Sequence, residues 1–252
     1  MLPEAFGLVE TAYFKSSDSV LKKGFKAFLE KPEVYKRDYL QAHYKGAFDG
    51  YSYLGQKDSL NQYDTDLLHS FVLSEFSKKE DFPKAFHPFL TQEWDHLITR
   101  IRQVEWEIMD DLKIPGLRQF YEANIGHMVS CNYYPPVNES VSSELRLSKH
   151  VDVSLFTVFV FGVPEGFAHH NALGQKQVLK TVDNIIVFPG YLLEYLTKGA
   201  YKALGHQVDF TNKSLERFSF AFFSIPKPFQ HLEFHGRQFT SEAYYQNYLS
   251  LF

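Results

Sequence analysis

Two histidines and an aspartate have the residue types and spacing of a metal site. His150 and Asp152 stand two residues apart at the start of an expected strand, so both side chains point to one face. His206, which follows Gly205, opens another expected strand. Two imidazoles and one carboxylate leave adjacent positions open on a metal, as non-haem Fe(II) requires to bind an organic chelator together with O₂. The His-x-Asp triplet alone would also suit a solvent-exposed strand end, but the additional histidine favours an iron site.

An arginine and a serine form a second group with chemical potential. Arg217 and Ser219 share one face of a strand that follows a predicted turn. If this strand forms a hairpin with the one that His206 opens, centred near residues 213–214, His206 lies opposite about Ala221, and Ser219 is roughly 7 Å away. A guanidinium donates two hydrogen bonds to a carboxylate, and a serine hydroxyl adds a third. We therefore expect this pair to hold the far end of a dicarboxylate whose near end chelates the metal.

The elements expected before these residues are helices and a long loop. Apolar residues at helical spacing predict a helix over 20–29, with capping side chains at 16–19 and a stop at Pro32. Residues 39–63, rich in Tyr, Gly and Asp, predict a loop with one short strand at 51–54, and we expect this loop to act as a lid over the site. The alternative is that its tyrosines pack on the outside of the barrel. An apolar stripe over 91–112 predicts the longest helix.

After residue 125, short β-branched and aromatic runs separated by turns predict strands. Their spacing is typical of an antiparallel sandwich or barrel. We expect one domain over residues 1–252, mainly β with flanking helices, in which a helical and loop-rich part (1–125) packs on a β core (126–252). The predicted strands are 127–134, 151–161, 178–182, 184–188, 192–196, 206–210 and 217–224.

The amino-acid composition limits which partners and which compartment we expect for the protein. Lys and Arg number 26 against 30 Asp and Glu, a formal net charge of −4, which offers no electrostatic footprint for nucleic acid. No run of about 18 apolar residues occurs, so no membrane span is expected. The single cysteine, Cys131, is expected to be a buried small hydrophobe and fits a reducing compartment. The start of the chain lacks the pattern of a secretory signal, so we expect a cytoplasmic protein.

Several longer segments resemble one protein family. They begin with Cys131-Asn-Tyr-Tyr-Pro-Pro136 and continue with HVDVSLFTVFV from His150. DNIIVFPGYLLEYLTKGAYKALGHQV then ends at Val208, RFSFAFF starts at Arg217, and GYSYLGQ covers residues 50–56. Together these segments resemble the Fe(II)/2-oxoglutarate oxygenases of the isopenicillin N synthase-like group. The resemblance implies a double-stranded β-helix, or jelly roll, as the core.

The resemblance also implies roles for individual residues. His150, Asp152 and His206 would be the iron ligands, and Arg217 with Ser219 would hold a carboxylate of the cosubstrate or substrate. Tyr134 and Asn132 would add hydrogen bonds to the cosubstrate.

The implied activity is a dioxygenase reaction that uses Fe(II), 2-oxoglutarate and O₂. It would hydroxylate or otherwise oxidise a small organic molecule such as an amino acid, a peptide or a natural-product precursor, in a monomer or weak homodimer. Residues 150–160 are more similar to isopenicillin N synthase than to most other members of the group. An oxidase that does not use 2-oxoglutarate is therefore an alternative. A non-catalytic jelly roll that binds a metal and a ligand is another.

Two further motifs are assigned other roles. Arg146-Leu-Ser148 also matches Arg-x-Ser, but it precedes the first ligand, so a structural or substrate-facing role is expected. His169 and His170 are metal-ligand types, yet the glycines around them predict a solvent-exposed turn.

Overall fold

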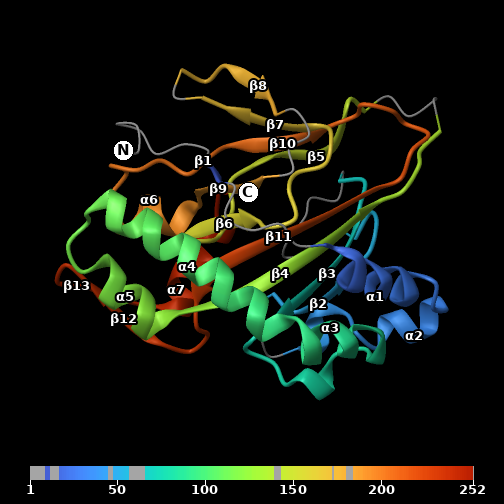
Figure 1. The fold of residues 1–252 in the computed structure, drawn as a ribbon, viewed down its shortest axis with the longest axis horizontal. Coiled ribbons are helices and arrows are strands. Elements are labelled where there is room, and N and C mark those ends of the chain that lie inside the picture. The colour runs from blue at the N-terminus through green and yellow to red at the C-terminus, as the bar shows by residue number, and fades with distance from the viewer. Residues whose placement is uncertain are drawn as a thin grey trace.

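The computed structural model describes residues 9–11, 17–44, 48–56, 66–138, 143–171, 173–179 and 184–251. Antiparallel strands form two facing sheets and a small hairpin, with helices around them, and this is the jelly-roll fold with flanking helices that the sequence predicts (Figure 1). No helix in the described ranges combines the length and apolar character that a membrane crossing needs.

The larger sheet has seven strands, and the smaller sheet has four. In spatial order the larger contains β1 (Val9–Thr11), β9 (Ile185–Pro189), β6 (Phe156–Phe159), β11 (Arg217–Pro226), β4 (Ile125–Tyr134), β3 (His69–Ser74) and β2 (Gly50–Ser52). The smaller contains β5 (Leu145–His150), β10 (His206–Asp209), β7 (Phe167–His170) and β8 (Lys176–Val178). A separate hairpin pairs β12 (His231–Phe234) with β13 (Arg237–Thr240).

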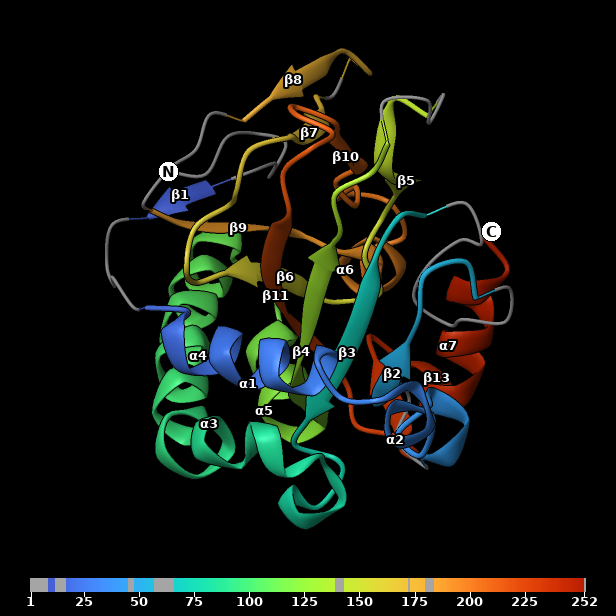
Figure 2. The same ribbon diagram turned by 90° about the vertical axis from the view of Figure 1, so that its right-hand side faces the viewer.

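The helices lie mostly around the larger sheet, below the smaller sheet in both views (Figures 1 and 2). The α-helices are α1 (Ser19–Leu29), α2 (Glu33–Arg37), α3 (His87–Gln92), α4 (Trp94–Leu112), α5 (Leu117–Asn124), α6 (Tyr191–Leu196) and α7 (Ser241–Leu249). Short 3₁₀ turns are η1 (Gln41–His43), η2 (Lys79–Asp81) and η3 (Lys84–Phe86).

Strands β4 and β11 lie side by side at the centre of the larger sheet. These strands stay in register over ten residue pairs, from Arg217 opposite Tyr134 to Pro226 opposite Ile125. Most of their residues are buried on both faces, which is why the sequence shows continuous apolar runs there rather than alternation. The end that carries Arg217 and Tyr134 belongs to the candidate site described below.

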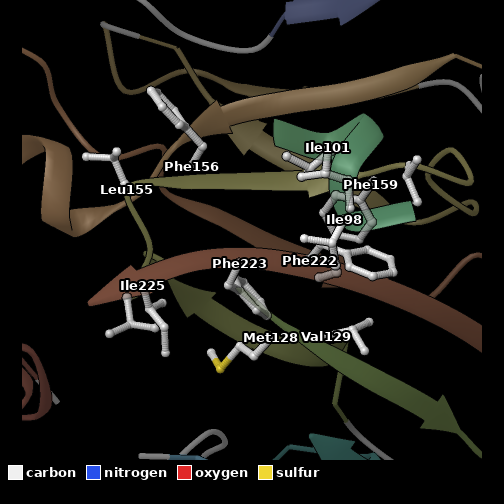
Figure 3. Close-up of a cluster of buried hydrophobic side chains, with 14 of the residues drawn as sticks. Ile98, Ile101, Met128, Val129, Leu155, Phe156, Phe159, Phe222, Phe223 and Ile225 are labelled. Atoms are coloured by element: carbon white, nitrogen blue, oxygen red, sulfur yellow. The ribbon is translucent and has the colours of Figure 1, made fainter. Parts of the chain in front are cut away.

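The longest helix packs its apolar stripe on this sheet. Ile98 and Ile101 of α4 lie against Phe159 and Phe222, while Phe223 lies near Met128 (Figure 3). Burying a large apolar side chain contributes about 1.5–3 kcal/mol, so the stripe stabilises the sheet from outside. The predicted helix over 91–112 is confirmed as α4, which begins at Trp94.

Two strand predictions are wrong in ways that matter for the site. Residues 192–196 form most of helix α6, because Leu192, Leu193 and Leu196 are buried together at helical spacing. The strand predicted over 151–161 is only β6, Phe156–Phe159. His150 therefore ends β5, and Asp152 lies in the segment that follows it.

Smaller differences concern element ends. The N-cap of α1 is Asp18, which makes no side-chain capping bond, while residue 16 lies outside the described ranges. Of the strand predicted over 178–182, β8 contains only Val178, and residues 180–182 are not described. The remaining predicted strands correspond to β4, β9, β10 and β11.

The expected lid falls only partly on described residues. Tyr51 belongs to β2, is fully buried and pairs with Phe71 of β3, so this part of the segment packs as sheet. Phe48 packs edge-on against Tyr245 of α7, with ring centroids 5.4 Å apart. Residues 45–47 and 57–65 lie outside the described ranges, and closure of the segment over substrate stays a prediction.

Candidate metal centre

Three side chains from different segments converge at one end of the two sheets. His150 at the end of β5 lies directly opposite His206 at the start of β10, and Asp152 follows two residues after His150. One ligand atom from each of the three lies within 4.8 Å of the others. The Nε2 atoms of His150 and His206 are 3.6 and 3.7 Å from Oδ1 of Asp152. These separations are too long for hydrogen bonds and suit three ligands around a shared ion.

Neighbouring groups fix which atom each side chain presents. The Nδ1 atom of His150 is 2.7 Å from the carbonyl oxygen of Ser148, and that of His206 is 3.0 Å from the carbonyl oxygen of Leu204. A carbonyl only accepts hydrogen bonds, so both Nδ1 atoms carry the proton and both Nε2 atoms present lone pairs. Thr157 donates to Oδ2 of Asp152 at 2.6 Å, which leaves Oδ1 for the centre.

The surroundings of the centre favour ligand protonation states. Burial lowers the pKa of His206 to about 4, which keeps its imidazole neutral, the form that binds metals. The rings of Phe167 and Phe188 lie 5.2 and 5.0 Å from the His206 ring and exclude water from it. Burial alone would raise the pKa of Asp152, but the two imidazoles and the Thr157 hydrogen bond outweigh it and lower that pKa. Burial lowers the pKa of His150, but Asp152 and the carbonyl of Ser148 outweigh it and raise that pKa. Asp152 is therefore an anion beside the neutral imidazole of His206.

Arg217 and Tyr134 form a second polar group, on the larger sheet. They lie opposite one another on β11 and β4, with the guanidinium carbon 4.8 Å from the centroid of the Tyr134 ring. Arg217 donates from Nε to the carbonyl oxygen of Glu165 at 2.9 Å and from Nη2 to that of Pro164 at 3.4 Å. Its Nη1 is buried and has no hydrogen-bond partner within the described part of the chain. A buried cationic group with an unpaired N–H donor is suited to bind an anionic ligand.

Ser219 and Asn132 extend this group by one row. They lie opposite one another on β11 and β4, two residues along from Arg217 and Tyr134 and so on the same face of the sheet. Burial raises the pKa of the Tyr134 hydroxyl, and the neighbouring Arg217 and Ser219 partly offset this effect. The structure thus gathers the four residues that the resemblance associates with a carboxylate ligand.

The hairpin expected between the strands of His206 and Arg217 is wrong. β10 pairs with β5 and β7 in the smaller sheet, whereas β11 pairs with β4 and β6 in the larger one. In a jelly roll, strands that follow one another along the chain cross between sheets. The arginine group therefore approaches the centre from the opposite sheet rather than from a neighbouring strand.

A small cavity of about 80 Å³ adjoins the centre. Two of its residues, Phe48 and Tyr248, come from the aromatic-rich segments 39–63 and 229–252. Asn132, His150 and Asp152 were predicted as site residues. The others were missed, although Met128 and Ser130 alternate with Asn132 along β4, the signal that would have found them. The full lining is Phe48, Leu68, Val72, Met128, Ser130, Asn132, Leu147, His150, Asp152, Val153, Phe223 and Tyr248.

Arg146 and Cys131 have structural surroundings. The Arg146 guanidinium is buried and donates to the carbonyl oxygens of Tyr134, Pro135, Asn212 and Leu215, so it ties three segments together. Cys131 is buried as expected, and burial raises the pKa of its thiol.

The prediction for the adjacent histidines is wrong. His169 and His170 belong to β7 rather than to an exposed turn, and both are half-buried. His169 lies opposite His206, because β7 pairs with the metal-site strand.

Comparisons with known proteins point to one family. Residues 125–226 match the model of the 2OG-Fe(II) oxygenase superfamily. Isopenicillin N synthase of Streptomyces griseus is 28% identical over 123 residues, which cover 46% of this chain and 37% of that enzyme. The chain thus aligns with well under half the length of this curated relative.

Solved structures share the fold. A full-length Neurospora crassa protein in complex with alpha-KG and thymine matches with a TM-score of 0.75, over 99% of this chain and 88% of that one, at 16% identity. The rice dioxygenase for auxin oxidation matches with a TM-score of 0.71, over 98% of this chain and 87% of that one, at 17% identity. Residues 125–226 thus match the 2OG-Fe(II) oxygenase superfamily, and the chain shares the fold of these solved structures.

Proposed function

We propose that this protein is an Fe(II)- and 2-oxoglutarate-dependent dioxygenase that oxidises a small organic molecule, in the simplest case by hydroxylating a C–H bond. The observation that carries the proposal is the convergence of His150 Nε2, His206 Nε2 and Asp152 Oδ1. Two imidazole nitrogens and one carboxylate oxygen are the donor set of non-haem Fe(II) oxygenases, so these residues fit the metal.

The chain's own residues would bind and orient the reactants. When bound, Fe(II) with 2-oxoglutarate and O₂ would supply the oxidising chemistry, with succinate and CO₂ as the products of the cosubstrate. The unpaired Nη1 of Arg217 would bind the far carboxylate of 2-oxoglutarate, and the hydroxyl of Ser219 would add a hydrogen bond. Tyr134 and Asn132 are proposed as further hydrogen-bonding partners of the cosubstrate. The apolar side chains of the cavity would keep bulk water from the reacting centre.

The proposal is tested by replacing one ligand and one distant histidine. Wild-type protein and His231→Ala, altered at an exposed position of β12, are expected to bind one Fe(II) per chain and to release succinate from 2-oxoglutarate. His206→Ala is expected to lose both properties while its circular dichroism spectrum stays native. Unchanged iron affinity and succinate release in His206→Ala would contradict the assignment.

A second candidate function is an oxidase of the isopenicillin N synthase type, which takes its electrons from the substrate. The observation that favours it is the match to the Streptomyces griseus synthase. In that case Arg217 and Ser219 would hold the substrate rather than 2-oxoglutarate. Product formation without succinate would support the oxidase, and succinate in equal amount to product would support the dioxygenase.

We also propose how and where the protein acts. Residues 1–252 would work as one oxygenase domain, as a monomer or weak homodimer in the cytoplasm, where a buried free thiol such as Cys131 stays reduced. The net charge of −4 supports small molecules rather than nucleic acid as its partners.

A further inference from the structure

The walls of the cavity beside the metal centre are mostly apolar. Apart from the two ligands His150 and Asp152, its polar residues among those that the structure describes are the neutral Ser130, Asn132 and Tyr248, and the Tyr248 hydroxyl donates to the carbonyl oxygen of Val151. The other lining residues are Phe48, Leu68, Val72, Met128, Leu147, Val153 and Phe223. The cavity therefore presents hydrocarbon and neutral hydrogen-bonding groups to whatever enters it.

No lysine or arginine lines the cavity within the described ranges. Arg146 is engaged by four backbone carbonyls, and Arg217 is the proposed partner of the cosubstrate. A substrate carboxylate would therefore meet no basic side chain in this wall, within the described ranges. Burying an unpaired charge costs more free energy than burying a neutral polar group, so a charged substrate is disfavoured.

The polar wall left to the substrate offers a hydrogen-bond acceptor. Ser130 donates its hydroxyl hydrogen to Oδ1 of Asn132 at 3.0 Å, which leaves the oxygen lone pairs of Ser130 to accept a hydrogen bond. Asn132 is the proposed partner of the cosubstrate. The N–H of a neutral amide or the O–H of an alcohol matches the Ser130 acceptor without needing a counterion.

The volume limits the part of the substrate that enters. The cavity measures about 80 Å³. A protein cavity of about 150 Å³ binds benzene, so the space here suits an aliphatic group better than an aromatic ring.

We propose that the primary substrate is an uncharged aliphatic molecule that carries a neutral hydrogen-bonding group, rather than an amino acid or another carboxylate. This inference rests on the proposed function, because it assigns the cavity to the substrate of that reaction. It narrows the substrate class from amino acids, peptides and natural-product precursors in general to uncharged aliphatic molecules, and it excludes free amino acids.

The test uses four probes that share one hydrocarbon body and differ in charge. They are 4-methylpentanamide, 4-methylpentanoate, 4-methylpentylamine and leucine, titrated by calorimetry into protein loaded with redox-inert Zn(II) and 2-oxoglutarate. The amide is expected to bind at least about tenfold more tightly than each charged probe, because only the charged probes lose solvation without a counterion. Equal affinities, tighter binding of a charged probe, or no binding of the amide would overturn the proposal.

Failure of the proposed function gives a different result. If 2-oxoglutarate does not bind to the Zn(II)-loaded protein, the dioxygenase proposal fails at that step. The same four probes are then titrated in its absence, and their order of affinity still decides the substrate class.

A charge introduced into the wall gives an independent readout. Leu147 is partly buried in the cavity wall and packs near Val208, so a lysine there can keep its ammonium group hydrated. Leu147→Lys is expected to shift the ratio of amide to carboxylate affinity at least about tenfold toward 4-methylpentanoate. Leu147→Gln, a neutral control of similar length, should leave the ratio within about twofold. An unchanged ratio in a natively folded Leu147→Lys protein would also overturn the proposal.

Discussion

His206 lies directly opposite His150 across β10 and β5, and each ring is held in the same way. In both, Nδ1 donates to the carbonyl oxygen of the residue two positions earlier, Leu204 or Ser148. The backbone thus sets both tautomers and aims both Nε2 atoms at Asp152. Such preorganisation means that the site does not have to reorient its ligands when a metal arrives.

Thr157 should matter for metal affinity although it is not a ligand. It donates to Asp152 Oδ2, so Thr157→Val keeps the shape of the side chain but frees the carboxylate to rotate. We expect Fe(II) affinity to fall by about 10- to 100-fold, measured by competition with a chelator. Thr99→Val, on the exposed face of α4, serves as the control. Equal affinity in both variants would show that Thr157 does not orient the ligand.

The metal ligands were predictable from the sequence because they are recognised by residue type and by short spacing. His150 and Asp152 stand two apart, and their convergence with His206 holds even though the strand assigned to them was misplaced. Strand pairing was not predictable in the same way. The turn after β10 is consistent with a hairpin, but burial of both faces of β11 between β4 and β6 places Arg217 in the other sheet.

The short helix α6 illustrates a second limit. Residues 192–196 are too few to distinguish a buried strand from a buried helix by periodicity. Backbone hydrogen bonds between residues distant in sequence favour the helix. The Tyr191 N–H donates to the carbonyl of Asp152, and the Leu192 N–H donates to that of Ser154. These bonds attach the start of the helix to the metal-site segment, a relationship that local propensity does not contain.

Arg217→Lys should separate the two candidate functions. Lysine keeps the charge but loses the planar fork and the Nη1 donor, so the KM for 2-oxoglutarate is expected to rise at least about tenfold, with a smaller effect on kcat. Arg118→Lys, at a half-exposed arginine that pairs with Asp110 and Glu122, is the control. If the Arg217 variant changes only the affinity for the primary substrate, the synthase-type oxidase is supported instead.

A buried histidine between two glutamates should make stability depend on pH. Nε2 of His127 is 2.9 Å from Glu105, and Nδ1 is 3.6 Å from Glu75. Burial lowers the pKa of His127, but the two carboxylates outweigh this and raise it. The protonated pair thus contributes stability fully below the ordinary pKa of about 6.5, and the contribution is lost as pH rises through the raised pKa.

Glu105→Gln removes one of these anions from the fully buried pair. We expect a loss of about 3–5 kcal/mol in the free energy of unfolding at pH 6, and a smaller loss at pH 9, measured by urea denaturation. Glu107→Gln, at an exposed position of the same helix α4, should change stability by less than about 0.5 kcal/mol. A loss that is equal at both pH values would show that the charge on His127 is not involved.

Replacing Asp49 should stabilise the protein at high pH, whereas replacing Glu105 should destabilise it. Its carboxylate is 1% exposed, one oxygen accepts hydrogen bonds from Ser74 and Ser77, and the other has no partner in the described ranges. Burial raises its pKa from 3.8 to about 6. Because the folded pKa exceeds the unfolded one, the contribution to stability is present below pH 3.8 and is lost as pH rises through about 6.

Replacing this carboxylate with an amide should therefore flatten the pH dependence of stability. At about 1.36 kcal/mol per pKa unit, the rise from 3.8 to about 6 corresponds to a total loss of about 3 kcal/mol, most of it between pH 4 and pH 8. Asp49→Asn cannot ionise, so its urea midpoint should fall less than that of the wild type over this range, and at pH 8 it should be the more stable protein. Asp111→Asn, an exposed control at the end of α4, should follow the wild type. Parallel curves for Asp49→Asn and the wild type would mean that the buried carboxylate is hydrated or paired in solution.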